Sequence, residues 1–98
     1  MTPDDIRRLI EPESHALRAR GVTALYVFGS TVAGNVHPSS DVDIVVEFDR
    51  GSSFNLFDLS GVRRQLSARL GVDVDVVTKD GLHRRIRDSV MRQAVRVL

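Results

Sequence analysis

The sequence contains no cysteine among its 98 residues. A disulfide-stabilised scaffold and a zinc site built on thiolates are therefore both excluded. The lack of cysteine also fits the reducing conditions of the cytoplasm. Hydrophobic residues make up 42% of the chain and charged residues 28%, which is ordinary for a globular protein. This length and composition predict a single domain, residues 1–98, with its own core.

Long hydrophobic runs are also missing. No apolar stretch approaches the roughly 20 residues that a helix needs to cross a bilayer. The N-terminal stretch MTPDDIRRL carries acids where a secretory signal would carry basic residues and an apolar segment. We therefore expect a cytoplasmic protein with no membrane association.

Aromatic residues and net charge are both scarce. Aromatic side chains account for 5% of the chain, which leaves few rings for stacking on bases, so direct nucleic-acid binding is disfavoured. The net charge is +1, but basic residues gather near the C-terminus: Lys79, Arg84, Arg85, Arg87, Arg92 and Arg96. This segment is either a solvated helix face, the simpler interpretation, or a surface that attracts phosphate or an acidic partner.

Hydrophobic periodicity and turn residues divide the chain into alternating elements. Helices are expected from Thr2, from Pro12 and over 54–70 and 80–94, and strands over 24–28, 41–48 and 72–78. Strands joined by a short loop pair antiparallel, and strands joined by a helix can pair in parallel. The order predicts an α+β fold in two layers, a small mixed β-sheet with helices packed on one face. The other face of that sheet would carry the aspartates described next.

Two aspartates, Asp41 and Asp43, open the alternating run DVDIVVEF. Residues two apart on a strand share a face at about 7 Å, so these carboxylates repel unless something positive lies between them. Asp73 and Asp75 repeat the pattern on the next expected strand. If the two strands are neighbours, a third carboxylate joins the first two. Carboxylates without histidine or cysteine suit Mg²⁺ or Mn²⁺.

A Gly-Ser pair, Gly29 and Ser30, ends the first expected strand. Glycine lets the backbone approach an anion closely, and exposed N–H groups with a serine hydroxyl can bind phosphate oxygens. Two Mg²⁺ ions about 4 Å apart can hold the attacking and leaving oxygens of a phosphoryl displacement. The pattern therefore predicts a phosphoryl-transfer site, with aspartates on the metals and the Gly-Ser turn on the phosphates.

Other known motifs match these residues less well. The segment from Gly29 to Gly34 has two glycines of a P-loop but lacks the Lys-Ser/Thr that follows them. The run from Asp41 to Val45 lacks the third ligand and the glycine of a calcium-binding loop. An isolated Asp-x-Asp can equally be a solvated sheet face. The combination of turn, spacing and a later acidic strand favours the metal site.

Gly29-Ser30, ten intervening residues and Asp41-Val42-Asp43 together resemble the signature of nucleotidyltransferases related to DNA polymerase beta. The short chain and the run from Val74 to Thr78 resemble the minimal nucleotidyltransferases of bacteria and archaea. The resemblance covers nearly the whole chain and is strongest over residues 21–78. It implies the polymerase beta-like nucleotidyltransferase fold.

The resemblance also implies roles for individual residues. Gly29 and Ser30 would bind the phosphates of ATP, and Asp41 and Asp43 would bridge two Mg²⁺ ions, with Mn²⁺ as the alternative. Asp75 would be the third carboxylate, which helps one metal and assists deprotonation of the attacking hydroxyl. Asp73 would have a supporting role at most. Members of this family are commonly encoded beside a HEPN-domain toxin, and some transfer AMP from ATP to a tyrosine of that toxin.

One difference from many relatives follows the Gly-Ser pair. Relatives often continue with Arg-Ala-Arg-Gly, whereas this chain has Thr31-Val32-Ala33-Gly34. A guanidinium group holds phosphate oxygens well, so its loss would either weaken ATP binding or pass this task to another arginine, for example Arg84, Arg85 or one from a partner. The difference leaves the expected metal ligands unchanged.

Three functions remain open at this point. The first is an active antitoxin that transfers AMP to a hydroxyl, expected to be a tyrosine, of a HEPN-type toxin in a hetero-oligomer. The second is a module that neutralises its partner by binding alone, which the missing arginines favour. The third, transfer to a small molecule such as an aminoglycoside, is disfavoured because the chain has no room for a substrate-binding domain.

Overall fold

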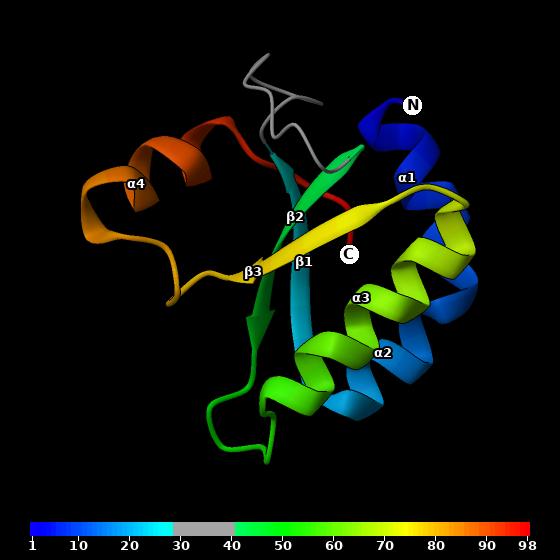
Figure 1. Cartoon of the computed structure of the whole chain (residues 1–98), viewed down its shortest axis with the longest axis horizontal. Helices are drawn as coiled ribbons and strands as arrows, with labels where there is room; N and C mark the ends of the chain where they lie inside the picture. Colours follow the sequence, from blue (N-terminus) through cyan, green and yellow to red (C-terminus); the bar gives the residue numbers. More distant parts are fainter. Residues whose placement is uncertain (29–40) are drawn as a thin grey trace.

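The chain folds as a four-stranded sheet with helices on both sides (Figure 1), and the computed structural model describes residues 1–28 and 41–98. The helices are α1 (Pro3–Ile10), the 3₁₀ helix η1 (Glu11–Glu13), α2 (Ser14–Arg20), α3 (Leu56–Leu70) and α4 (Arg84–Gln93). The strands are β1 (Val22–Phe28), β2 (Val42–Phe48), β3 (Val74–Thr78) and β4 (Val95–Arg96).

The sheet is mixed, as the sequence predicts, and its strand order is β3-β2-β1-β4. β1 pairs with β2 antiparallel, and β2 pairs with β3 in parallel across the α3 connection. β4 adds a short antiparallel edge to β1 and was not expected, because two residues are too few to show a periodic pattern. The arrangement confirms the α+β class and leaves β2 as an inner strand beside β3.

Helices α1, α2 and α3 cover one face of the sheet, as expected (Figure 1). Their apolar stripes pack on the alternate residues of the strands that face them. The core that results includes Ile6, Ile10, Leu17, Leu25, Val27, Ile44, Val46, Val62, Leu66 and Val74. This core holds β2 and β3 in fixed register beneath α3.

Helix α4 lies on the opposite side of the sheet, where Figure 1 shows it apart from the other three helices. The Ile86 side chain of α4 is 49% exposed, and no residue of this helix is buried. The expected start of the helix at Asp80 is wrong, because the helix begins after His83 and Asp80 pairs with Arg50. His83 caps it by accepting a hydrogen bond from the Arg85 N–H at Nδ1.

Local signals set the other helix boundaries. Thr2 and Asn55 each form a reciprocal capping box with an aspartate three residues later, which satisfies backbone N–H groups of the first turn. Gly21 and Gly71 end α2 and α3 with φ values of 113° and 71°, a conformation that other residues adopt at a cost. Pro12 interrupts the N-terminal helix at η1, as expected.

The longest of these helices, α3, has 15 residues. None of the helices in the two described ranges combines the length and the apolar character that crossing a bilayer requires.

Candidate active site

Asp43 occupies the second position of β2, on the sheet face turned away from α1, α2 and α3. Its side chain is only 3% exposed, and it is the single buried charged residue in the described part of the chain. Phe28 of β1 is its register partner on one side and Asp75 of β3 on the other. A carboxylate enclosed in this way needs hydrogen bonds or opposite charge around it.

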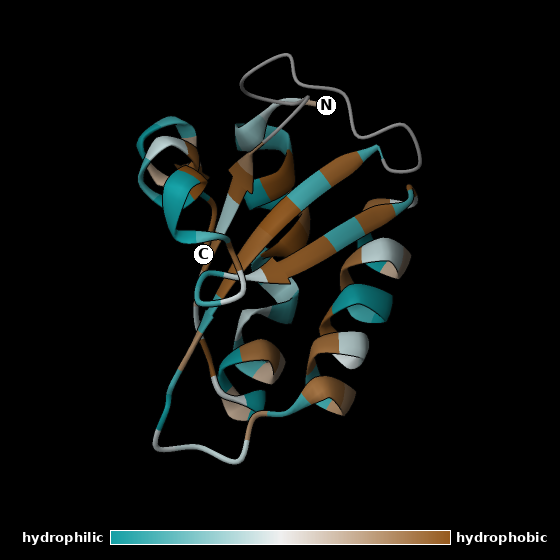
Figure 2. Cartoon of the chain, turned by 60° about the vertical axis from the view of Figure 1, so that its left-hand side comes forward, coloured by the Kyte–Doolittle hydropathy of each residue, from teal (hydrophilic) through white to brown (hydrophobic). Residues whose placement is uncertain are grey.

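Asp75 lies directly beside Asp43 across the parallel pairing of β2 and β3. Aligned residues of neighbouring strands project from the same face of a sheet, and both strands show hydrophilic bands among apolar ones in Figure 2. The neighbouring positions Val42, Val74 and Ile44 point into the core. The alternation in both strands therefore brings the two carboxylates to one surface.

Asp41 lies just before β2 and is exposed. Its backbone N–H donates to the Asp73 carbonyl oxygen at 2.9 Å, and its Oδ2 accepts from the Asp73 N–H at 3.2 Å. Asp73 in turn lies 3.6 Å from Arg63. This reciprocal pair fastens the start of β2 to the approach of β3. It also turns the Asp41 carboxylate toward the backbone of Asp73.

The structure thus brings Asp43 and Asp75 together and holds Asp41 alongside Asp73. Within residues 1–28 and 41–98, no three acidic or histidine side chains converge closely enough to form a preassembled metal cluster. Any approach of the Asp41 carboxylate to this pair would first require release of its hydrogen bond with the Asp73 N–H, a net change of about 1 kcal/mol. The donor set consists of carboxylate oxygens only, and this set fits Mg²⁺ or Mn²⁺.

The two residues that the sequence assigns to phosphate binding, Gly29 and Ser30, lie outside the described residues. Thr31 and Ala33, at the positions where relatives carry arginine, lie outside them as well. The roles of Gly29 and Ser30 therefore stay predictions. Of the arginines suggested as replacements, Arg84 and Arg85 are exposed on the first turn of α4.

A polar network on the same sheet face was not expected from the sequence. The Tyr26 hydroxyl of β1 donates to Glu47 Oε1 at 2.8 Å, and Lys79 Nζ lies 3.5 Å from the same oxygen. Burial raises the pKa of the Tyr26 phenol, and the hydrogen bond to the Glu47 carboxylate raises it further. Register alone brings these residues together, so sequence spacing gave no signal of the network.

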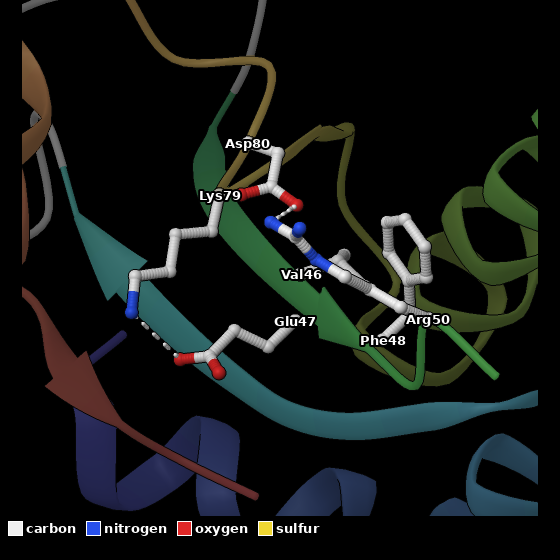
Figure 3. Close-up of a pocket in the computed structure, with 6 residues that line it drawn as sticks. All are labelled: Val46, Glu47, Phe48, Arg50, Lys79 and Asp80. Carbon is white, nitrogen blue, oxygen red and sulfur yellow. Dashed lines mark hydrogen bonds and ion pairs between the residues drawn. The ribbon is translucent and has the colours of Figure 1, made fainter. Parts of the chain in front are cut away.

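A small cavity of about 150 Å³ lies beside this network at the C-terminal end of β2 (Figure 3). Its two cations are matched by two carboxylates: Lys79 lies 3.5 Å from Glu47, and Arg50 lies 2.7 Å from Asp80. Val46 and Phe48 complete the lining. With its charges balanced, this cavity offers no excess positive charge to a phosphate group.

Comparison with known proteins finds a matching family and several relatives of this chain. The family described as "Nucleotidyltransferase domain" matches residues 13–97. The protein adenylyltransferase MntA of Thermococcus cleftensis is 37% identical over 98 residues, covering 99% of this chain and 97% of that protein. A protein of Methanocaldococcus jannaschii, provisionally named a protein adenylyltransferase, is also 37% identical and is covered completely.

Solved structures show the same fold. A minimal nucleotidyltransferase superposes with a TM-score of 0.74 at 33% identity, covering 97% of this chain and 95% of that one. The MNT antitoxin from a complex with the tri-AMPylated HEPN toxin of Shewanella oneidensis gives a TM-score of 0.61 at 21% identity. It covers 94% of this chain and 71% of that one, and at this identity it supports the fold alone.

Proposed function

Because the chain belongs to the nucleotidyltransferase domain family, we propose that it is a Mg²⁺-dependent protein adenylyltransferase that acts as the antitoxin of a HEPN-type toxin. It would transfer AMP from ATP to a tyrosine hydroxyl of that partner. Relatives named protein adenylyltransferase match over their full length, which supports this activity. The observation that carries the proposal is the alignment of the buried Asp43 with Asp75 on one face of the sheet.

The reaction forms one bond and breaks one bond at the α-phosphorus of ATP. The acceptor oxygen attacks this atom, and the bond to the oxygen that bridges the α- and β-phosphates breaks. Pyrophosphate leaves with the electron pair of that bond. Asp75 accepts the proton of the acceptor hydroxyl and passes it to solvent, so that AMP ends as an ester of the acceptor.

The carboxylates would hold the metal ions, and the Gly-Ser pair would hold the phosphates of the nucleotide. Asp41, Asp43 and Asp75 would hold two Mg²⁺ ions, which when bound neutralise charge on the phosphates and on the attacking and leaving oxygens. Gly29, which follows Phe28 in the chain, and Ser30 would bind phosphate oxygens through backbone N–H groups and the serine hydroxyl. Phe28 is the register partner of Asp43, which supports a phosphate-binding turn next to the metal ligands.

The proposed partner is a HEPN-domain toxin, and the working form would be a hetero-oligomer in the cytoplasm. Toxin–antitoxin complexes among the structures of the same fold support this arrangement. Their antitoxins are 20–21% identical to this chain, so the partner itself is part of the proposal.

The test is AMP transfer from labelled ATP to the HEPN-type protein encoded beside this chain, with and without Mg²⁺. Replacing both Asp41 and Asp43 by asparagine should reduce transfer at least about 100-fold, because asparagine cannot supply anionic oxygens to the metals. Replacing the exposed Asp88 of α4 by asparagine is the matched control and should leave the rate unchanged. Transfer that persists in the double variant would overturn the assigned mechanism.

A second candidate is neutralisation of the partner by binding alone. Two observations favour it: neither of the usual arginines follows the Gly-Ser pair, and the Asp41 carboxylate is engaged with Asp73. The two candidates differ in whether the carboxylates are needed to protect cells from the partner.

A further inference from the structure

A second cavity, of about 180 Å³, lies at the edge of the sheet between α3 and β3. It is lined by Leu56, Leu59, Ser60, Arg63, Asp75 and Val76. The four α3 residues follow the spacing i, i+3, i+4, i+7, so they form one stripe of the helix. This stripe lies beside the core stripe of α3 and faces the edge strand instead. One wall of the cavity is therefore the proposed catalytic carboxylate, Asp75.

Exposed apolar side chains lie in and beside this cavity: Leu56 lines it, and Phe57 is the next residue in the chain. Leu56 is 80% exposed and the adjacent Phe57 is 85% exposed, the two most exposed large hydrophobic side chains in the described part of the chain. Both lie in the first turn of α3, next to the capping residue Asn55. Exposed apolar side chains at the rim of a cavity are typical of a site where another molecule binds.

Hydrogen bonds from side chains of α3 hold this helix against β3 at the cavity. Arg63 Nε donates to the Val74 carbonyl oxygen at 3.0 Å, and its guanidinium group lies 3.6 Å from the Asp73 carboxylate. Ser67 Oγ accepts from the Val74 N–H at 3.3 Å. The outward backbone groups of Val74 are thus satisfied by α3, and a cation is fixed beside Asp75. A cation in this position can also lie against an aromatic ring.

We propose that this cavity is the acceptor site, which receives the aromatic ring of the tyrosine that is modified. This inference rests on the proposed function and adds the residues that select the acceptor. An apolar cavity of about 150 Å³ accommodates a benzene ring, so 180 Å³ is sufficient for a phenol. The ring contacts Leu56, Leu59 and Val76, and its hydroxyl reaches Asp75. Phe57 contacts the chain on either side of the tyrosine.

The chemistry of the transfer supports this assignment. The tyrosine hydroxyl has an ordinary pKa near 10, so it needs a base close to the attacking oxygen. Asp75 borders both the cavity and the face that carries Asp43, so a phenol in the cavity approaches the nucleotide site from the sheet edge. The protein's own tyrosine does not compete, because the Tyr26 hydroxyl is bound to Glu47.

The test compares variants at the mouth and inside the cavity, with the HEPN-type protein encoded beside the chain as acceptor. Replacing Ser60 by tryptophan fills the cavity and should reduce AMP transfer about tenfold or more, whereas replacing it by alanine should not. Replacing Leu56 and Phe57 together by alanine should raise the KM for the acceptor about tenfold and leave kcat unchanged. The exposed Ile86 of α4 provides the matched apolar control, and Ile86→Ala should change neither constant.

A second measurement separates this inference from the function on which it rests. Mg²⁺-ATP affinity, measured by calorimetry, should stay within about twofold of the wild type in all cavity variants, because none of them touches the phosphates or metals. A wild-type protein that transfers no AMP would overturn the proposed function. An active wild type with equally active Ser60→Trp and Leu56→Ala/Phe57→Ala variants would overturn the acceptor site alone. Equal losses in Ile86→Ala would also overturn it.

Discussion

Two polar residues on the same face of the sheet, the buried Asp43 and the half-buried Tyr26, have different surroundings. Tyr26 has its partner on the neighbouring strand, since its hydroxyl donates to Glu47. Asp43 is aligned with another carboxylate, Asp75. A hydrogen bond joins the first pair, and a bound cation would favour the alignment of two carboxylates in the second. Burial alone therefore does not mark a functional residue, and the charge of its neighbours must be considered.

The titration of Tyr26 should make the stability of the protein depend on pH in the alkaline range. Burial, followed by the Glu47 hydrogen bond, raises its pKa above the ordinary value of 10.0. The folded state therefore retains the phenol proton at a pH where the unfolded state has lost it, and stability from this group falls as pH rises above about 10. Tyr26 is the only tyrosine and the chain has no tryptophan, so tyrosinate absorbance reports this group alone.

The same titration distinguishes the two causes. Glu47→Gln should lower the apparent pKa of Tyr26 only part of the way, because burial remains. Tyr26→Phe should remove the corresponding part of the alkaline loss of unfolding free energy. An unshifted midpoint in the wild type would contradict this account.

The candidate site residues were predictable because spacing fixes the face of a strand. Period-two alternation put Asp41 and Asp43 on one face and Asp73 and Asp75 on one face of the next strand, and the family resemblance singled out Asp75. The register of β2 with β3 places Asp43 and Asp75 together. The hydrogen bond from the Asp73 N–H to Asp41 was not predictable, since it depends on the position at which β3 begins. The contact between Tyr26 and Glu47 was not predictable either, because it is set by the pairing of β1 with β2.

Helix α3 connects the candidate acceptor site with the core. One stripe, which includes Val62 and Leu66, packs under the sheet, and another lines the cavity beside β3. The first turn of the helix carries Leu56 and is held by Asn55, whose Oδ1 accepts from the Phe57 and Asp58 N–H groups at 2.9 and 3.2 Å. The shape of the cavity mouth thus depends on this cap.

Removing the Asn55 cap should destabilise helix α3. Asn55→Ala should lower the free energy of unfolding by about 1 kcal/mol, because it leaves N–H groups of the first turn without a partner. Asn55→Asp keeps the acceptor oxygen and should stay close to the wild type. Denaturant unfolding measures both. Equal stabilities for the alanine and aspartate variants would show that the cap contributes nothing.

Elements with a strong periodic pattern were predicted within a few residues. The helix expected over 54–70 runs from Leu56 to Leu70, and the strand expected over 72–78 runs from Val74 to Thr78. The signals failed where local chemistry was ambiguous. Asp80 resembles a capping residue, yet its ion pair with Arg50 leaves the capping position to His83.

The two faces of the sheet carry different kinds of residue. The face under α1, α2 and α3 provides the core, and the other face carries the carboxylates. Helix α4 stands on the carboxylate side with exposed arginines and no buried residue, so it adds charge without closing a second core (Figure 1). A partner that is neutralised by AMP transfer would have to bring its acceptor hydroxyl to the sheet edge beside Asp75, whereas a partner that is neutralised by binding alone has no such requirement.

Protection of cells therefore distinguishes the two candidate functions. The Asp41→Asn/Asp43→Asn variant should form the complex with the HEPN-type partner as well as the wild type does, because Asp43 is buried and both changes preserve shape. It should nevertheless fail to protect cells that express the partner, since AMP is not transferred. Co-purification measures the complex, and growth measures protection. The control Asp88→Asn should protect fully. Protection by the double variant would establish binding as sufficient, and the carboxylates would then have no part in neutralisation.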